Sequence, residues 1–189
     1  MLRLGDPLTE ILRRRLGPRT ADALYEAGGE MGLPAGEHAS PLCAAYSLLK
    51  LNFQADEVSR MLSWRDFERL AGLLLRASGY GVRDNVVLTK PRAQIDVVAS
   101  GPSLVLAVDC KHYQREQGPS SLERAASAQL NRSALLRRKT SDARPIASVI
   151  LSMSEPEGRF VGGVAVVPIR TLRSFLTTLD SYGPYLELK

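Results

Sequence analysis

The spacing of the apolar residues changes at Gly79, and this change limits the folds that are open to the chain. From residue 63 onward, apolar side chains recur at helical spacing, which is typical of an amphipathic helix. Short apolar stretches at 82–88, 93–99 and 104–109 follow, with turn-forming residues between them. The pattern therefore predicts one helix followed by three strands, the last two of them joined as a hairpin.

The rest of the chain divides into a part with both helices and strands and a part with helices alone. Further elements are predicted after the hairpin: a long polar helix at 121–139, strands at 146–153 and 163–168, and a closing helix at 172–179. The first sixty residues contain only short helical patterns, which glycine and proline separate. We therefore expect an N-terminal helical region at 1–60 and a second domain at 61–189.

The composition excludes several classes of protein. Hydrophobic residues make up 44% and charged residues 24% of the 189 residues, which is typical of a globular chain. Cys43 and Cys110 are the two cysteines, and their wide spacing argues against a zinc site or a disulfide framework. The net charge of +5 favours polyanionic partners but does not identify one. Without a signal peptide or a long apolar run, we expect a cytoplasmic protein that has no membrane contact.

Three charged side chains interrupt apolar strand patterns. Asp96 lies in the sequence QIDVV, and Asp109 and Lys111 lie in LAVDCKH. Burying a charge without a partner is costly, so these residues need an explanation. One alternative is a surface ion pair between Asp109 and Lys111 on an edge strand, which would contribute little stability. The apolar flanks and the presence of Asp96 favour a functional site instead.

The expected hairpin brings the two aspartates together. Asp109 and Lys111 project from the same face of their strand, because successive side chains alternate. If the turn centres on residues 101–102, Asp96 lies opposite Ala107 and diagonal to Asp109, roughly 7–8 Å away at the backbone. A register that differs by one residue would place the aspartates on opposite faces.

This arrangement suits a hard divalent cation. Two carboxylates, a main-chain carbonyl and water are the oxygen ligands that Mg²⁺ prefers. Such an ion polarises a phosphodiester and lowers the pKa of a bound water, and Lys111 could orient that water or neutralise developing charge. Glu68 lies at the edge of the apolar stripe of the first predicted helix and could supply a third carboxylate.

The motifs between residues 63 and 113 resemble the catalytic domain of the Mrr-like restriction endonucleases, within the PD-(D/E)-x-K superfamily that also includes archaeal Holliday-junction resolvases. The resemblance is carried by Trp64-x-x-Phe67-Glu68, Gly79-Tyr80, Ile95-Asp96-Val97 and Asp109-Cys110-Lys111-His112. It implies an α/β fold with a restriction-endonuclease-like core, in which helices flank a mixed β-sheet. It also implies DNA cleavage that depends on Mg²⁺, for which Mn²⁺ can substitute.

The resemblance assigns roles to four residues. It implies catalytic roles for Glu68, Asp96, Asp109 and Lys111, with Asp96 and Asp109 as metal ligands. Glu68 matches the helix glutamate of the family, and we expect it to be the third metal ligand.

The sequence also departs from the family pattern. Ile95 replaces the usual proline before the first aspartate, and Asp109 stands where Glu or Gln is more usual. Gln129 matches a glutamine of related nucleases, but Ser133 stands where some branches have a tyrosine.

Basic and polar residues near this motif are candidates for contact with nucleic acid. We expect contacts from Lys111, His112, Gln129, Arg132, Arg137 and Arg138. The alternative is that the arginines lie on a helix face that contacts only solvent and has no role in binding. His112 should point away from Asp109, and Trp64 is expected to serve packing rather than stack on a base.

Three functions are therefore compatible with the sequence. The leading hypothesis is a Mg²⁺-dependent DNA endonuclease, whose role in restriction, repair or recombination is open. The alternative is a DNA-binding or assembly module that has kept the nuclease fold and lost activity. A purely structural basic protein is the third. A homodimer would fit the first hypothesis, because cleavage of both strands needs two active sites.

Overall fold

The computed structural model of the chain contains a six-stranded mixed sheet and describes residues 6–112, 118–153 and 160–189. The strands are β1 (Gly81–Leu88), β2 (Ala93–Ser100), β3 (Val105–Lys111), β4 (Ile146–Ser152), β5 (Phe160–Val161) and β6 (Val164–Pro168). Their order across the sheet is β1-β2-β3-β4-β6-β5. The pairs β3–β4 and β4–β6 are parallel, and the other neighbours are antiparallel.

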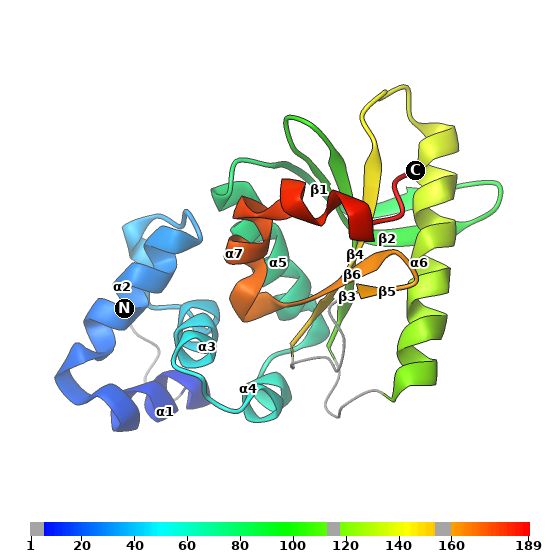
Figure 1. Cartoon of the computed structure of the whole chain (residues 1–189). Helices are drawn as coiled ribbons and strands as arrows, with labels where there is room; N and C mark the ends of the chain where they lie inside the picture. The colour runs from blue at the N-terminus through cyan, green and yellow to red at the C-terminus, as the bar shows by residue number, and fades with distance from the viewer. Residues whose placement is uncertain (1–5, 113–117, 154–159) are drawn as a thin grey trace.

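Helices cover both faces of this sheet. Helix α6 (Pro119–Lys139) lies on one face, and α5 (Trp64–Ala77) and α7 (Leu172–Thr177) lie on the other (Figure 1). This arrangement confirms the predicted α/β fold with a mixed sheet. Within the described ranges, none of the helices combines the length and the apolar character needed to cross a membrane.

Helix α5 begins and ends where the sequence predicts. The Ser63 hydroxyl accepts a hydrogen bond from the N–H of Asp66, whose carboxylate accepts one from the N–H of Ser63. This reciprocal capping fixes the first turn. The helix gives way to Gly79, whose φ of 88° lies in the region that favours glycine. Between these ends, the apolar stripe faces the sheet and places Glu68 at the edge of that buried face.

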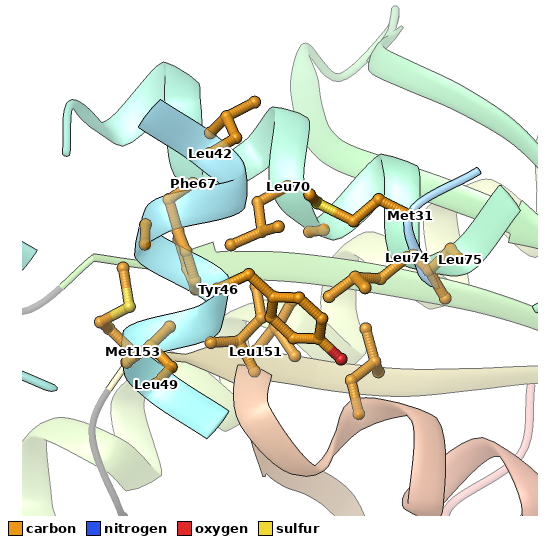
Figure 2. Packing of buried hydrophobic residues seen from close by; sticks show 14 of the residues in the cluster. Met31, Leu42, Tyr46, Leu49, Phe67, Leu70, Leu74, Leu75, Leu151 and Met153 are labelled. Atoms are coloured by element: carbon orange, nitrogen blue, oxygen red, sulfur yellow. The ribbon is translucent and has the colours of Figure 1, made fainter. Parts of the chain in front are cut away.

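The N-terminal helices share the main core with the sheet. They are α1 (Pro7–Leu16), α2 (Thr20–Glu30), α3 (Pro41–Lys50) and α4 (Ala55–Met61). Figure 2 shows Tyr46 and Leu49 of α3 close to Phe67 of α5 and Leu151 of β4, all in one hydrophobic cluster. The core therefore runs across residue 60, and the predicted boundary between 1–60 and 61–189 stays an interpretation of the sequence.

The β2–β3 hairpin differs from its predicted register. Ser100 pairs with Val105, so the loop contains residues 101–104 and does not centre on 101–102. Consequently Val98, and not Asp96, pairs with Ala107. The predicted pairing was wrong by two residues, because the turn lies one residue further along the chain than expected.

The corrected register brings the two aspartates closer together. Val97 and Val108 form the last pair at this end of the hairpin, which makes Asp96 and Asp109 the next residues along each strand. Ile95 and Val98 belong to the same hydrophobic cluster, although regular alternation would place them on opposite faces. Strand β2 is therefore locally irregular at Asp96, where the candidate site begins.

A buried hydrogen bond between two serines joins α6 to the sheet. The hydroxyls of Ser133 and Ser148 lie 2.6 Å apart, and both side chains are buried. We predict that Ser133→Ala lowers the free energy of unfolding by about 1–3 kcal/mol, because it leaves the Ser148 hydroxyl without a partner. Ser133→Ala with Ser148→Ala should cost less than the sum of the two single changes. Denaturant unfolding of the three variants measures this, and strictly additive losses would contradict the prediction.

Candidate active site

Asp96 reaches across from β2 to the backbone of β3. Its Oδ2 atom accepts a hydrogen bond of 2.8 Å from the N–H of Cys110. Burial raises the pKa of Asp96 above its usual value, the Cys110 N–H opposes that rise, and the charge of Asp109 adds to it. The carboxylate is thus fixed at the end of the hairpin, beside a second acid.

Asp109 is a buried carboxylate held between two cations. Its side chain is 6% exposed, with Nζ of Lys111 2.8 Å from Oδ2 and Nη1 of Arg132 3.0 Å from Oδ1. The Oδ2 atom is buried and accepts no hydrogen bond from the described residues, even though the ammonium is close. A buried charge of this kind is tolerated only because opposite charges compensate it. The pair predicted between Asp109 and Lys111 therefore exists, but it lies inside a site and not on an exposed strand surface.

Helix α6 supplies the second cation through an internal hydrogen-bond chain. The amide Nε2 of Gln129 donates to the carbonyl of Ala107, 2.8 Å away, and its Oε1 accepts from Nη1 of Arg132 at 3.0 Å. Arg132 donates from the same Nη1 atom to Asp109. Gln129 thus holds the arginine against the carboxylate.

Glu68 approaches the aspartates from α5, on the other face of the sheet. Burial, followed by the charges of Asp96, Asp84 and Asp109, raises the pKa of Glu68 to about 7, while Arg65 opposes the rise. The three candidate acids therefore interact electrostatically. Within the described part of the chain, however, no group of three or more His, Cys, Asp or Glu side chains is arranged to hold a metal ion. The role of Glu68 as a third ligand stays a prediction.

The acids are nevertheless suited to Mg²⁺. Asp96 and Asp109 provide hard oxygen donors on neighbouring strands, and Mg²⁺ needs only one or two protein carboxylates when water completes its shell. The buried Oδ2 of Asp109, for which the described ranges supply no hydrogen-bond donor, has the capacity to coordinate an ion. Asp96 and Asp109 would hold that ion, with Lys111 beside it.

Two residues that were expected to contact nucleic acid, Gln129 and His112, make contacts within the protein. Gln129 is completely buried, and its amide already donates and accepts hydrogen bonds. The ring of His112 packs 5.8 Å from that of Phe67, with Nε2 buried, on the face away from Asp109 as strand alternation predicts. Burial lowers the pKa of His112. We therefore correct the predicted nucleic-acid contact of Gln129, because nucleic acid cannot reach a side chain that is completely buried. His112 is half-buried, and its nucleic-acid contact stays a prediction.

The arginines at the end of α6 have different surroundings. Arg137 donates hydrogen bonds to the carbonyls of Asp142 and Arg144, which ties the end of the helix to the loop before β4. Arg137 is half-buried, and its nucleic-acid contact stays a prediction. Arg138 is exposed and stays a candidate phosphate contact.

The ion pair between Arg132 and Asp109 was not predicted from the sequence, because Arg132 was expected to contact nucleic acid. A signal for it exists in α6. The buried stripe of that helix includes Leu122, Ala126, Gln129, Ser133 and Leu136, so two polar residues interrupt it. A buried glutamine needs internal partners, and the arginine three positions later lies within its reach.

The raised pKa of Glu68 has a consequence for stability. A carboxyl whose pKa is higher in the folded than in the unfolded protein destabilises the fold as pH rises between the two values, here from about 4.3 to about 7. In EDTA, we predict that Glu68→Gln raises the Tm more at pH 8 than at pH 5, with a gain on the order of 1 kcal/mol at pH 8 after allowance for solvent screening. Exposed Glu123→Gln on α6 is the control. A Glu68→Gln gain that does not depend on pH would contradict the prediction.

Comparison with known proteins identifies the region around these residues. Residues 59–136 match the family model described as restriction endonuclease, the Mrr catalytic domain. An uncharacterized protein of Archaeoglobus fulgidus is 29% identical over 129 residues, which cover 64% of this chain and 95% of that protein. No solved structure matches the chain at a significant level.

The matched region contains α5, the hairpin and most of α6, and therefore every side chain of the candidate site. The match indicates a nuclease-type domain. It confirms the resemblance drawn from the motifs: residues 59–136 of this chain are similar to the catalytic domain of the Mrr-like restriction endonucleases.

Proposed function

We propose that the chain is a Mg²⁺-dependent endonuclease that hydrolyses phosphodiester bonds in DNA. The observation that carries the proposal is the buried Asp109 carboxylate, which lies beside Asp96 and within 2.8 Å of the Lys111 ammonium. A carboxylate pair and an amine at one end of a hairpin are the groups that metal-dependent hydrolysis requires. The match to the restriction endonuclease model supports the same activity.

Each side chain has a task in this proposal. Asp96 and Asp109 hold the cation, which when bound supplies Lewis acidity and lowers the pKa of a water molecule. Lys111 stands beside the carboxylates and neutralises negative charge that develops on the phosphate oxygens. Arg132 and Gln129 position Asp109, because their hydrogen bonds fix its carboxylate against β3.

A second function is supported by one specific feature of the site. The positive charges of Lys111 and Arg132 already compensate the negative charge of Asp109, so a metal ion is not needed for that. Such a closed arrangement is compatible with the alternative of an inactive module that binds DNA through its basic residues. That module would bind DNA in a salt-sensitive way and would not cut it when Mg²⁺ or Mn²⁺ is added.

A cleavage assay separates the two functions. We predict that the protein cuts DNA in Mg²⁺ or Mn²⁺ and stops when EDTA is added. Asp109→Asn should lower the cleavage rate at least about 100-fold, because it removes the charge that holds the cation. It should leave DNA binding in EDTA within about threefold of the wild type, since phosphate contacts elsewhere supply most of that affinity.

The exposed Asp22→Asn on α2 serves as the matched control and should cut like the wild type. Equal cleavage by Asp109→Asn and the wild type would contradict the assigned site. DNA binding with no cleavage in either metal would favour the inactive module. The described structure gives no support to the expected homodimer, so the proposal concerns cutting of single phosphodiester bonds.

A further inference from the structure

A groove next to Glu68 is not used by the chemistry described above. It has a volume of about 480 Å³ and lies between α5 and β1. Its lining includes Trp64, Arg65, Arg69 and Glu68. The groove therefore shares Glu68 with the candidate active site, and its volume is within the range of small-ligand sites.

Trp64 is exposed at this groove, although the sequence favoured a packing role for it. The side chain is at the first position of α5 and is 53% exposed. It lies four residues before Glu68, and residues at this spacing share one face of a helix. An indole in this position leaves a large apolar surface in water beside a catalytic candidate.

Both arginines and acids surround Trp64, because Glu68 and Asp84 line the groove together with its arginines. The Arg65 guanidinium lies 5.3 Å from the centre of the indole ring, a cation–π distance. Arg69 is 61% exposed at the same groove and is 3.6 Å from Glu37. Arg76, by contrast, is paired with Asp84 at the far side. Arg65 and Arg69 therefore give the rim near the indole a charge that complements phosphates.

An exposed aromatic ring flanked by arginines fits an unpaired strand better than a duplex. Bases in a duplex are stacked on each other, so their faces are not available to a side chain on the surface. Unpaired bases expose those faces and stack on aromatic residues, while nearby basic groups contact the backbone. A fully paired duplex would contact the arginines alone.

We propose that this groove binds unpaired nucleotides of a DNA substrate, with Trp64 stacked on a base and Arg65 and Arg69 contacting phosphates. The substrate class of the enzyme would then be DNA in which unpaired nucleotides adjoin the strand that is cut. This inference deepens the proposed nuclease function and rests on it.

The chain has one tryptophan, so its fluorescence reports on this groove. We titrate the protein in EDTA with three DNAs of one sequence: a single strand, a duplex with a single-stranded overhang, and a blunt duplex. The single strand and the overhang should quench Trp64 emission strongly, and the blunt duplex should quench it weakly. Equal quenching by all three, or quenching by none, would overturn the inference.

Variants test the same groove through affinity for labelled DNA. Trp64→Ala should weaken binding of the single strand and the overhang by about 5- to 100-fold, the range expected when one stacked base is lost. Trp64→Phe, which keeps an aromatic ring, should give an intermediate loss. Tyr25→Ala, which removes an exposed aromatic of α2, should have no effect. Unchanged affinity in Trp64→Ala would overturn the inference, and circular dichroism melting checks that each variant is folded.

The two proposals fail in different ways. Because binding is measured in EDTA, it does not depend on cleavage. Cleavage by the wild type with unchanged binding in Trp64→Ala would reject the groove and leave the nuclease in place. Quenching by unpaired DNA without cleavage in Mg²⁺ or Mn²⁺ would keep the binding groove and reject the nuclease, and with it the assigned substrate class.

Discussion

The buried carboxylate at the end of β3 needs positively charged partners, and the surrounding structure supplies them. Asp109 has a side chain that is only 6% exposed, and such a carboxylate is stable only when cations or hydrogen bonds compensate it. Lys111 comes from the same strand, whereas Arg132 comes from α6. Helix α6 must therefore pack on the sheet in a position that brings Arg132 to Asp109. The hydrogen bond from Gln129 to the carbonyl of Ala107 stabilises that position.

This requirement connects the fold to the chemistry. The hairpin brings Asp96 beside Asp109, and the Cys110 N–H fixes the first of these carboxylates. Helix α5 adds Glu68 from the opposite face, where burial and the neighbouring acids raise its pKa to about 7. The site thus brings three acids together, and Lys111 and Arg132 compensate the charge of Asp109.

Much of this fold follows from local patterns. The helix that begins after Ser63 and the succession of strands and helices along the chain were predicted, because capping residues and apolar periodicity are local signals. The mixed sheet was implied by the resemblance to the nuclease family. Helix α4 was missed, since it has seven residues and is too short for a clear repeat. The hairpin register was wrong because the pattern did not define where the loop begins, and it lies at residues 101–104.

The site was less accessible to sequence reasoning than the fold. The motif identified Asp96, Asp109 and Lys111, but the contact between Arg132 and Asp109 depends on how α6 crosses the sheet. The exposure of Trp64 likewise depends on where α5 begins relative to β1. Both are tertiary features, and a stripe of apolar residues does not determine them.

The central claim is that Asp96 and Asp109 hold one divalent cation, and calorimetric titration of Mn²⁺ into the DNA-free protein tests it most directly. We predict that the wild type binds Mn²⁺ saturably. Asp96→Asn should lower that affinity at least about tenfold, and Asp22→Asn should not. Binding that is equally tight in Asp96→Asn, or an absence of binding in the wild type, would contradict the account.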